Sequence, residues 1–204
     1  MRSTLRHTKS AVVSDFRRGQ ILSAARQSFV RHGMADTTVA GIARAAGVAK
    51  GTVYLYYRSK DDILRQLLSQ DLTELHADTL PIVSEPGSIQ EKLARFLHAT
   101  LAFFDRKRDF VEQCQSETSA DIWRKARHKL GLVFAAQIDA WRAALDDGIA
   151  AGEVAPCDPA SAARGIVSFA HGLAVQRLRG WCTEPAGDTV RWATALLWQG
   201  LVPR

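Results

Sequence analysis

Apolar residues recur at the spacing of an α-helix along nearly the whole chain, and this pattern limits the fold more than any other feature of the sequence. Ile21, Ala25 and Phe29 begin one such stripe, and similar stripes follow as far as the C-terminal region. The sequence contains no clear alternation of apolar and polar residues, which would indicate a half-buried strand, and no repeat. It therefore predicts an all-α protein.

Glycine, proline and capping residues divide the apolar pattern into about nine helices. Gly33, Gly47 and Gly152 are typical of helix ends, and the segment from Pro81 to Gly87 is expected to end the fourth helix. Asp158 followed by Pro159 predicts a helix start. The expected helices cover residues 15–32, 39–46, 49–56, 61–80, 89–105, 109–118, 121–151, 159–179 and 188–200, with Thr37 or Thr38, Ser59 and Asp188 as further caps.

Positive charge is concentrated near the N-terminus. Residues 1–65 contain 12 Lys or Arg and 4 Asp or Glu, whereas the remaining residues contain 15 and 17. All three tyrosines, Tyr54, Tyr56 and Tyr57, lie in the same basic region. This distribution indicates a local surface for a polyanion, and a solvated basic face without a partner is the alternative.

Several protein classes are disfavoured by what the sequence lacks. No stretch approaches the roughly 18 apolar residues of a membrane span, and no apolar signal core follows the basic N-terminus, so we expect a cytoplasmic protein without a membrane partner. The three cysteines are far apart, which argues against a disulfide framework or a zinc site. Nucleotide-binding loops and GxSxG motifs are missing, and we expect no enzyme activity, cofactor or metal.

Residues 37–57 predict two short helices joined by a tight turn at Gly47. Ile42, Ala43 and Val53 are expected to face inward, which leaves the exposed side of the second helix available to enter a DNA major groove. The alternative is an ordinary helical hairpin within a bundle. The residues expected on the exposed side are Ala49, Lys50, Gly51, Thr52 and Tyr56.

The stretch over residues 37–64 resembles the signature of TetR-family transcriptional regulators and reads TTVAGIARAAGVAKGTVYLYYRSKDDIL. Tyr57 and Asp61 are small departures from it. The resemblance implies a homodimer in which each subunit has a three-helix DNA-binding domain, a connecting fourth helix and a helical ligand-binding domain. The expected division is a flexible basic arm over 1–14, a helix-turn-helix domain over 15–60, and a ligand-binding and dimerisation domain over 61–204 whose first helix, 61–80, is the connector.

The expected DNA contacts fall into two kinds. Lys50 and Thr52 are candidates for base edges, whereas Tyr54 and Lys60 resemble family positions that contact phosphates. Tyr57 is expected in the core. The complete set of DNA-binding candidates is Thr38, Arg44, Ala49, Lys50, Gly51, Thr52, Tyr54, Tyr56 and Lys60.

Aromatic residues in the C-terminal region are candidates for the lining of a ligand site, although residues at helical spacing also suit a core. An apolar or aromatic small-molecule effector would fit such a site. His98 and His171 could supply polar anchors. The ligand-binding candidates are Phe103, Phe104, Phe110, Trp123, Phe134, Trp141 and His171, with Phe169 as a further aromatic.

The last two expected helices, about 159–179 and 188–200, carry small and apolar residues suited to a dimer interface, with intramolecular packing as the alternative. The expected stripe comprises Ala162, Gly165, Phe169, Gly172, Leu173, Gln176, Trp192, Leu196 and Gln199. The function expected from all these features is a repressor that a small effector releases from a palindromic operator. A TetR-type activator is an alternative, as is a basic helical protein that binds membranes or binds nucleic acid nonspecifically.

Overall fold

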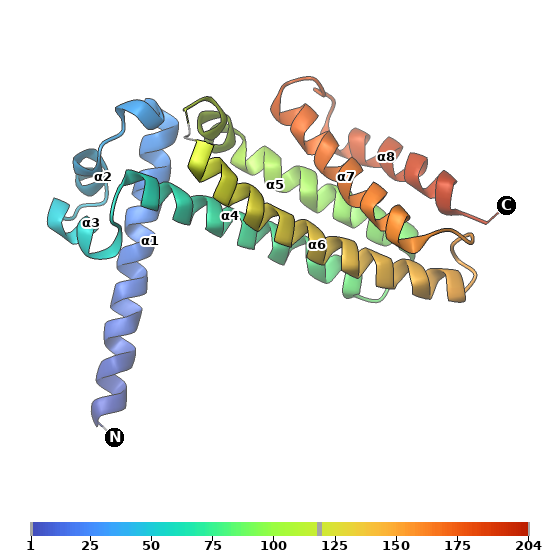
Figure 1. Cartoon of the computed structure of the whole chain (residues 1–204), viewed down its shortest axis with the longest axis horizontal. Coiled ribbons are helices and arrows are strands. Elements are labelled where there is room, and N and C mark those ends of the chain that lie inside the picture. Colours follow the sequence, from blue (N-terminus) through green and yellow to red (C-terminus); the bar gives the residue numbers. More distant parts are fainter. Residues whose placement is uncertain (1, 118–119, 204) are drawn as a thin grey trace. The chain divides into compact units, whose positions relative to one another are not determined.

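The computed structural model describes the backbone of residues 2–117 and 120–203, and the side chains of residues 12–113 and 128–203. Over these ranges the chain forms eight α-helices and no strand (Figure 1). The all-α prediction is therefore confirmed. The helices are α1 (Arg2–Asp36), α2 (Val39–Ala45), α3 (Lys50–Tyr56), α4 (Lys60–Ser84), α5 (Ile89–Glu117), α6 (Ala120–Ala150), α7 (Pro159–Leu178) and α8 (Ala186–Leu201).

The chain divides into two compact units, which are described separately. Unit 1 comprises Met1–Gln70 with Asp109–Ala126, and unit 2 comprises Asp71–Arg108 with Arg127–Arg204. The division differs from the boundary after residue 60 that the sequence suggests, because the start of α4 and the end of α5 belong to unit 1.

Local sequence signals place most helix ends correctly. Gly33 interrupts α1 with a φ of 78°, and Gly152 follows α6 with a φ of 72°, both in the left-handed region that suits glycine. The Ser59 hydroxyl accepts a hydrogen bond from the Asp62 amide at 3.1 Å, so Ser59 caps α4 as predicted. The Asp158 carboxylate likewise accepts from two amides at the start of α7.

α4 ends within the segment from Pro81 to Gly87, as predicted, but at Ser84 rather than at residue 80, so Pro81 lies inside the helix. Proline has no N–H group and its ring crowds the carbonyl four residues earlier, so it disfavours a helix interior. The next residues compensate, since Val83 is 2% exposed and Ile82 packs against the core of unit 2. Burial of these side chains keeps the last turn helical.

Three other helix boundaries differ from expectation. α5 joins the two helices predicted over 89–105 and 109–118, because the Arg106–Arg108 segment between them contains no glycine or proline. α1 begins at Arg2, so it extends into the segment expected as an arm, whose mobility remains a prediction. α8 begins at Ala186, which places Asp188 in the first turn rather than at the cap.

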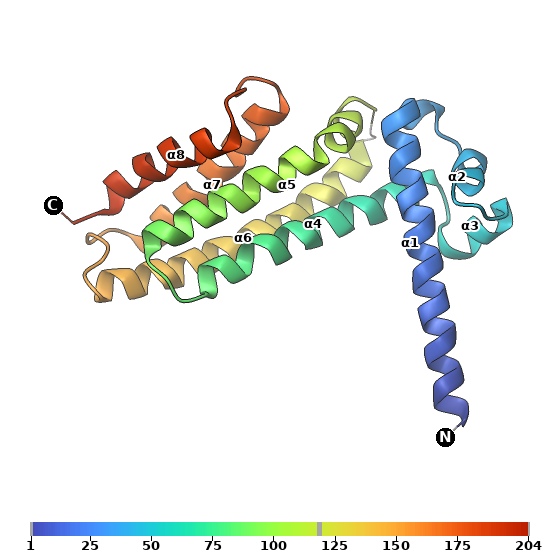
Figure 2. The same ribbon diagram turned by 180° about the vertical axis from the view of Figure 1, so that it is seen from behind.

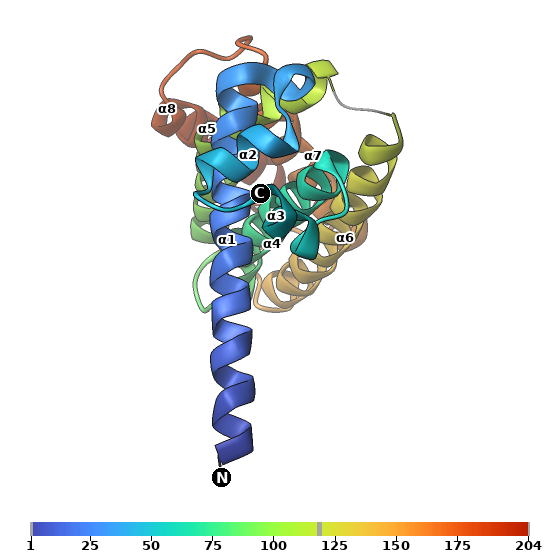
Figure 3. The ribbon, with the colours of Figure 1, turned by 90° about the vertical axis from the view of Figure 1, so that its left-hand side faces the viewer.

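The described core of unit 1 draws residues from α1, α2, α3, α4 and α5. In this unit α2 and α3 lie on one side of the C-terminal half of α1 (Figures 1 and 3). The buried cluster contains Ile21, Leu22, Ala25, Phe29, Met34, Ile42, Ala43, Val53, Tyr57, Ile63, Leu64, Leu67 and Phe110. Tyr57 lies in this core as predicted, and its hydroxyl donates to the Arg18 carbonyl at 3.4 Å. Burial raises the pKa of Tyr57.

Unit 2 is a bundle that contains the second part of α4 and most of α5 and α6, together with α7 and α8 (Figure 2). Its main buried cluster draws residues from all five helices. Trp141 and Phe96 are fully buried near its centre and meet edge to face, with ring centroids 5.5 Å apart. No described helix has both the length and the apolar character required to cross a membrane.

Candidate nucleic-acid interface

The link from α1 to α2 is fixed by two neighbouring threonines. Thr38 caps α2, and its Oγ1 accepts a hydrogen bond from the Gly41 amide at 3.1 Å. The Thr37 side chain is buried, and its hydroxyl lies 3.1 Å from the Ser28 carbonyl and 2.7 Å from the Gly33 carbonyl. These bonds hold the start of α2 against the end of α1.

The turn between α2 and α3 depends on Gly47. Its φ is 64°, a left-handed conformation that costs other residues about 1–2 kcal/mol. The Gly47 amide donates to the Arg44 carbonyl at 3.1 Å, and the Val48 amide donates to the Ala43 carbonyl at 3.0 Å. A Cβ added at Gly47 would meet no atom within 4 Å, so backbone conformation rather than space favours glycine here.

α3 presents one face to its own core and another to solvent. Val53 is fully buried, whereas Ala49, Lys50, Gly51 and Tyr54 are exposed. Thr52 and Tyr56 are half-buried. This arrangement agrees with the division expected from the sequence, and it leaves the predicted base-reading side chains accessible.

Leu55 is 82% exposed on α3, a feature that the sequence analysis missed. Its spacing from Val53 carried the signal, because residues two apart in a helix lie on nearly opposite faces. An exposed leucine on the same helix face as Gly51 and Thr52 gives that face an apolar contact surface. Thymine methyl groups are the complementary feature in a major groove.

Cationic side chains lie over the tyrosines of α3. Lys50 Nζ is 6.0 Å from the centroid of the Tyr54 ring. The guanidinium carbon of Arg18, on α1, is 5.9 Å from that of Tyr56. Positive charge therefore lies close to two aromatic rings on the accessible side of the helix-turn-helix.

Lys60 has a structural role that the sequence did not predict. Its ammonium group donates to the carbonyls of Met34 and Ala35 at the end of α1. Carbonyl groups at a helix C-terminus carry partial negative charge, which a lysine offsets. A phosphate contact of Lys60 would therefore be additional to its bonds with these carbonyls. The other phosphate candidate, Tyr54, has an exposed side chain.

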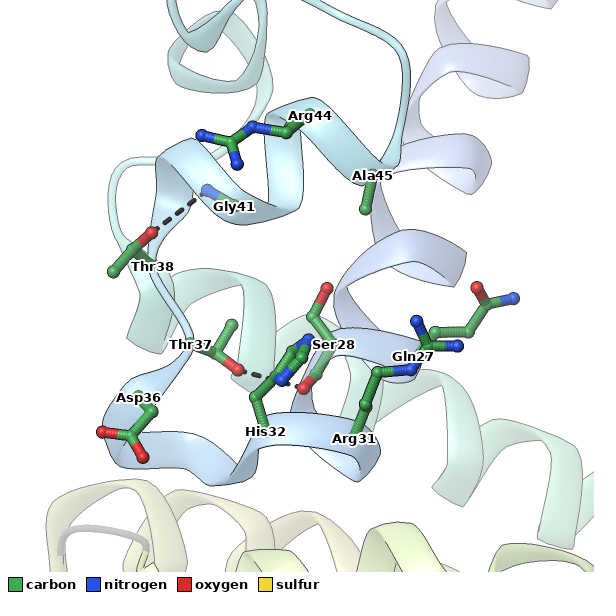
Figure 4. A pocket seen from close by; sticks show the side chains of 10 residues that line it. All are labelled: Gln27, Ser28, Arg31, His32, Asp36, Thr37, Thr38, Gly41, Arg44 and Ala45. Carbon is green, nitrogen blue, oxygen red and sulfur yellow. Dashed lines mark hydrogen bonds between the residues drawn. The ribbon is translucent and has the colours of Figure 1, made fainter.

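A surface hollow of about 300 Å³ lies between α1 and α2 (Figure 4). It brings together two predicted residues, Thr38 and Arg44, with Arg31 and His32, which sequence reasoning missed. The signal for Arg31 and His32 was their position in the basic N-terminal region. The complete lining is Gln27, Ser28, Arg31, His32, Asp36, Thr37, Thr38, Gly41, Arg44 and Ala45.

The aromatic residues predicted to bind a ligand do not all lie together: in unit 2 some surround His171, and Trp141 packs elsewhere. In unit 2, Phe104 lies 5.3 Å from Phe103 and 6.1 Å from His171, measured between ring centroids. The centroid of Phe134 is 3.9 Å from that of His171. Trp141 instead packs in the core against Phe96.

Two other predicted ligand residues do not join this group. Phe110 is buried in the core of unit 1, where its ring lies 6.5 Å from Phe29 and 4.4 Å below the Arg26 guanidinium, so assigning it to a ligand site is wrong. The side chain of Trp123 lies outside the described residues. His98 is exposed on α5 rather than turned toward a buried site.

The expected dimerisation stripe also needs one correction, because Leu173 is 4% exposed and packs into the core of unit 2. Among the described side chains, no three His, Cys, Asp or Glu residues gather as a metal site would require.

Comparison with known proteins places these features in a family. Residues 21–67, which include the complete helix-turn-helix, match the family described as bacterial regulatory proteins, tetR family. A fatty acid metabolism regulator protein from Bacillus subtilis is 29% identical over 137 residues, which are 66% of this chain and 69% of that protein.

Solved structures share the whole fold. One is the transcriptional regulator FadR from Bacillus subtilis in complex with stearoyl-CoA, with a TM-score of 0.68, 22% identity and coverage of 89% of this chain and 97% of that one. Another is NalD, the secondary repressor of the MexAB-OprM multidrug efflux pump in Pseudomonas aeruginosa, with a TM-score of 0.68, 22% identity and coverage of 93% and 97%. Together with the helix-turn-helix geometry, the family match shows that residues 21–67 form a DNA-binding domain of the TetR family of bacterial regulatory proteins, and the solved structures show that the chain shares their fold.

Proposed function

We propose that this regulator is a repressor that binds a palindromic operator as a homodimer and is released by a small apolar or aromatic effector. The observation that carries the DNA-binding part is the orientation of α3. Val53 is fully buried, so the opposite side of the helix, which carries Gly51 and Leu55, faces solvent, and Lys50 and Tyr54 are exposed beside it. A short helix held in this way after a glycine turn suits insertion into a major groove.

Unit 1 would contact the DNA in two ways. Lys50 and Thr52 would read base edges, while Tyr54 and the hollow around Thr38 and Arg44 would contact phosphates. Gly51 would allow close approach of the backbone to the groove, Tyr56 would stack on a sugar or a thymine methyl, and Ala49 would face the DNA at the start of α3. Lys60 would contribute charge near the start of α4.

Unit 2 would provide the dimer interface through α7 and α8. Trp192 is 42% exposed, Leu196 is 55% exposed, and Trp192 meets Phe169 of α7 edge to face. Gly165 and Gly172 lie on the exposed side of α7, and a Cβ at either would meet no atom within 4 Å. An apolar patch across two helices, with small residues that permit close approach, suits a second copy of the chain.

Unit 2 would also bind the effector. Four buried side-chain polar atoms among the described residues have no hydrogen-bond partner, and all four belong to this unit. Such atoms are uncommon in protein interiors. The FadR relative in complex with stearoyl-CoA and the NalD repressor support a ligand-responsive repressor as the function.

Footprinting of the purified protein on DNA flanking its own gene would test the proposal. The expected result is protection of two half-sites whose centres are about 34–36 Å apart or a multiple of that distance. Equal affinity for this fragment and for random DNA in a gel-shift series would contradict a specific regulator. Activation rather than repression would appear as a loss of transcription when the gene for this protein is deleted.

A further inference from the structure

Three buried polar side chains form a hydrogen-bond chain inside unit 2. They are Thr79 on α4, Gln137 on α6 and His171 on α7, which are 0%, 0% and 7% exposed. Gln137 Nε2 lies 2.7 Å from Thr79 Oγ1, and Gln137 Oε1 lies 3.1 Å from His171 Nε2. The chain ends at the Leu75 carbonyl, 2.6 Å from Thr79 Oγ1.

The donor and acceptor of each of these hydrogen bonds follow from the bond between Thr79 and the Leu75 carbonyl. The single hydroxyl hydrogen of Thr79 is donated to the Leu75 carbonyl, so Oγ1 must accept from Gln137. The amide NH₂ of Gln137 therefore faces Thr79, and its carbonyl oxygen faces His171. Because a carbonyl oxygen only accepts, His171 Nε2 must carry a hydrogen.

This assignment leaves Nδ1 of His171 as an unprotonated acceptor when the ring is neutral. Burial lowers the pKa of His171 to about 4, so the neutral ring is the form present near neutral pH. Within the described part of the chain, Nδ1 has no hydrogen-bond partner. A buried acceptor without a donor is a place where a ligand with a donor gains affinity.

The surroundings of His171 are aromatic. The Phe134 ring lies 3.9 Å from the imidazole, at an angle of 31°, and Phe104 approaches edge-on at 6.1 Å. Both phenylalanines are half-buried, whereas His171 is buried. Two aromatic rings therefore lie against an imidazole that carries one unpaired acceptor.

We propose that Nδ1 of His171 accepts a hydrogen bond from a hydroxyl group of the effector, and that the effector is a neutral hydroxylated aromatic compound of the phenol type. This inference rests on the proposed function, in which unit 2 binds the effector. A carboxylate fits less well, because it brings a second acceptor to Nδ1 and would require protonation of a buried imidazole. Thr79 and Gln137 are positioning residues that hold the imidazole in the required tautomer.

Nuclear magnetic resonance of the full-length protein with ¹⁵N-labelled histidine tests the tautomer directly. Two-bond correlations between the ring carbon-bound hydrogens and nitrogens distinguish a protonated nitrogen from an unprotonated one. We expect His171 to carry its hydrogen on Nε2 at neutral pH. Thr79→Val should produce a mixture of tautomers because Gln137 loses its acceptor, whereas Thr79→Ser should preserve the wild-type spectrum.

Three probes of similar shape test the ligand class, namely 2-naphthol, 2-methoxynaphthalene and 2-naphthoate. Calorimetric titration should give about tenfold tighter binding of 2-naphthol than of 2-methoxynaphthalene, the effect of one neutral hydrogen bond. 2-Naphthol should also shift the Nδ1 resonance of His171, and 2-methoxynaphthalene should not. The variant His171→Phe keeps an aromatic ring but has no acceptor, so it should bind 2-naphthol and 2-methoxynaphthalene with about equal affinity.

The inference would be overturned by a protonated Nδ1 in the free protein, by equal binding of 2-naphthol and 2-methoxynaphthalene, by preferred binding of 2-naphthoate, or by failure of all three to bind. The footprint on operator DNA does not depend on any of these results, so it tests the proposed function separately. Conversely, absence of a footprint would leave the tautomer and the hydroxyl preference measurable. The two failures are therefore distinguishable.

Discussion

Acidification is expected to destabilise unit 2 through His171. The pKa of this residue is about 4 in the folded protein because its ring is buried, compared with 6.5 for an exposed histidine. Below pH 6.5 the unfolded chain therefore binds a proton that the folded chain does not bind. The contribution of the neutral His171 ring to the free energy of unfolding is fully present above pH 6.5 and decreases as the pH falls toward 4.

The magnitude follows from this difference in pKa. Each unit corresponds to about 1.4 kcal/mol, so the complete loss is about 3 kcal/mol. Between pH 7 and pH 5 the expected loss is about 2 kcal/mol, because the folded ring remains almost unprotonated over that interval. This is a substantial part of the stability of an ordinary domain.

Urea unfolding at pH 7 and pH 5, at one protein concentration, measures the effect. Tryptophan fluorescence is the appropriate signal, since four of the five tryptophans belong to unit 2. The comparison is with His171→Gln, whose amide can still donate to Gln137 but does not titrate. His98→Gln, at an exposed histidine of α5, is the matched control and should retain the wild-type dependence.

The wild-type protein should lose about 2 kcal/mol more than His171→Gln over this interval. An identical pH dependence for wild type and His171→Gln would refute the reasoning. It would mean that the imidazole is hydrated in the folded protein, or that it is charged there.

Gly47→Ala should destabilise unit 1 by about 1–2 kcal/mol because of its left-handed backbone, as measured by tyrosine fluorescence during urea unfolding, whereas Gly51→Ala within α3 should not destabilise it. Tyr54→Phe should weaken binding to operator and random DNA alike by about 1 kcal/mol in gel shifts, and a loss confined to the operator would contradict a phosphate contact. The wild-type dimer, with about 8–12 phosphate contacts, should show a log–log salt slope of about −7 to −11, and a slope near zero would exclude this interface. Leu196→Asp should yield monomers in analytical ultracentrifugation, whereas Leu132→Asp, at a similarly exposed leucine of α6, should leave dimers intact.

The helix-turn-helix could be predicted from sequence because its determinants are local. Thr38 caps an amide three residues away, and Gly47 determines its own backbone conformation. Val53 and Gly51 lie on nearly opposite faces of α3 because they are two residues apart in a helix, and Val53 is buried whereas Gly51 is exposed. None of these features requires knowledge of a distant segment.

The end of α4, four residues beyond the expected boundary at residue 80, shows where local rules fail. Proline disfavours helix continuation by removing one hydrogen bond and crowding the carbonyl four residues earlier, but the burial of Val83 in unit 2 offsets that cost. Whether Val83 is buried depends on helices that lie far away in the sequence. Phe110 illustrates the same limit, because its place in unit 1 depends on contact with Phe29, 81 residues earlier.

The helical character of this chain, most of its helix ends and its helix-turn-helix of the TetR type can be predicted from the amino-acid order, since these properties depend on neighbouring residues. The contact of Lys60 with the end of α1, and the hydrogen bonds that join Thr79, Gln137 and His171, arise only from the packing of the folded chain. These partners are 25, 58 and 34 residues apart. Their contacts depend on how helices pack, and residue spacing along the chain carries no record of that packing.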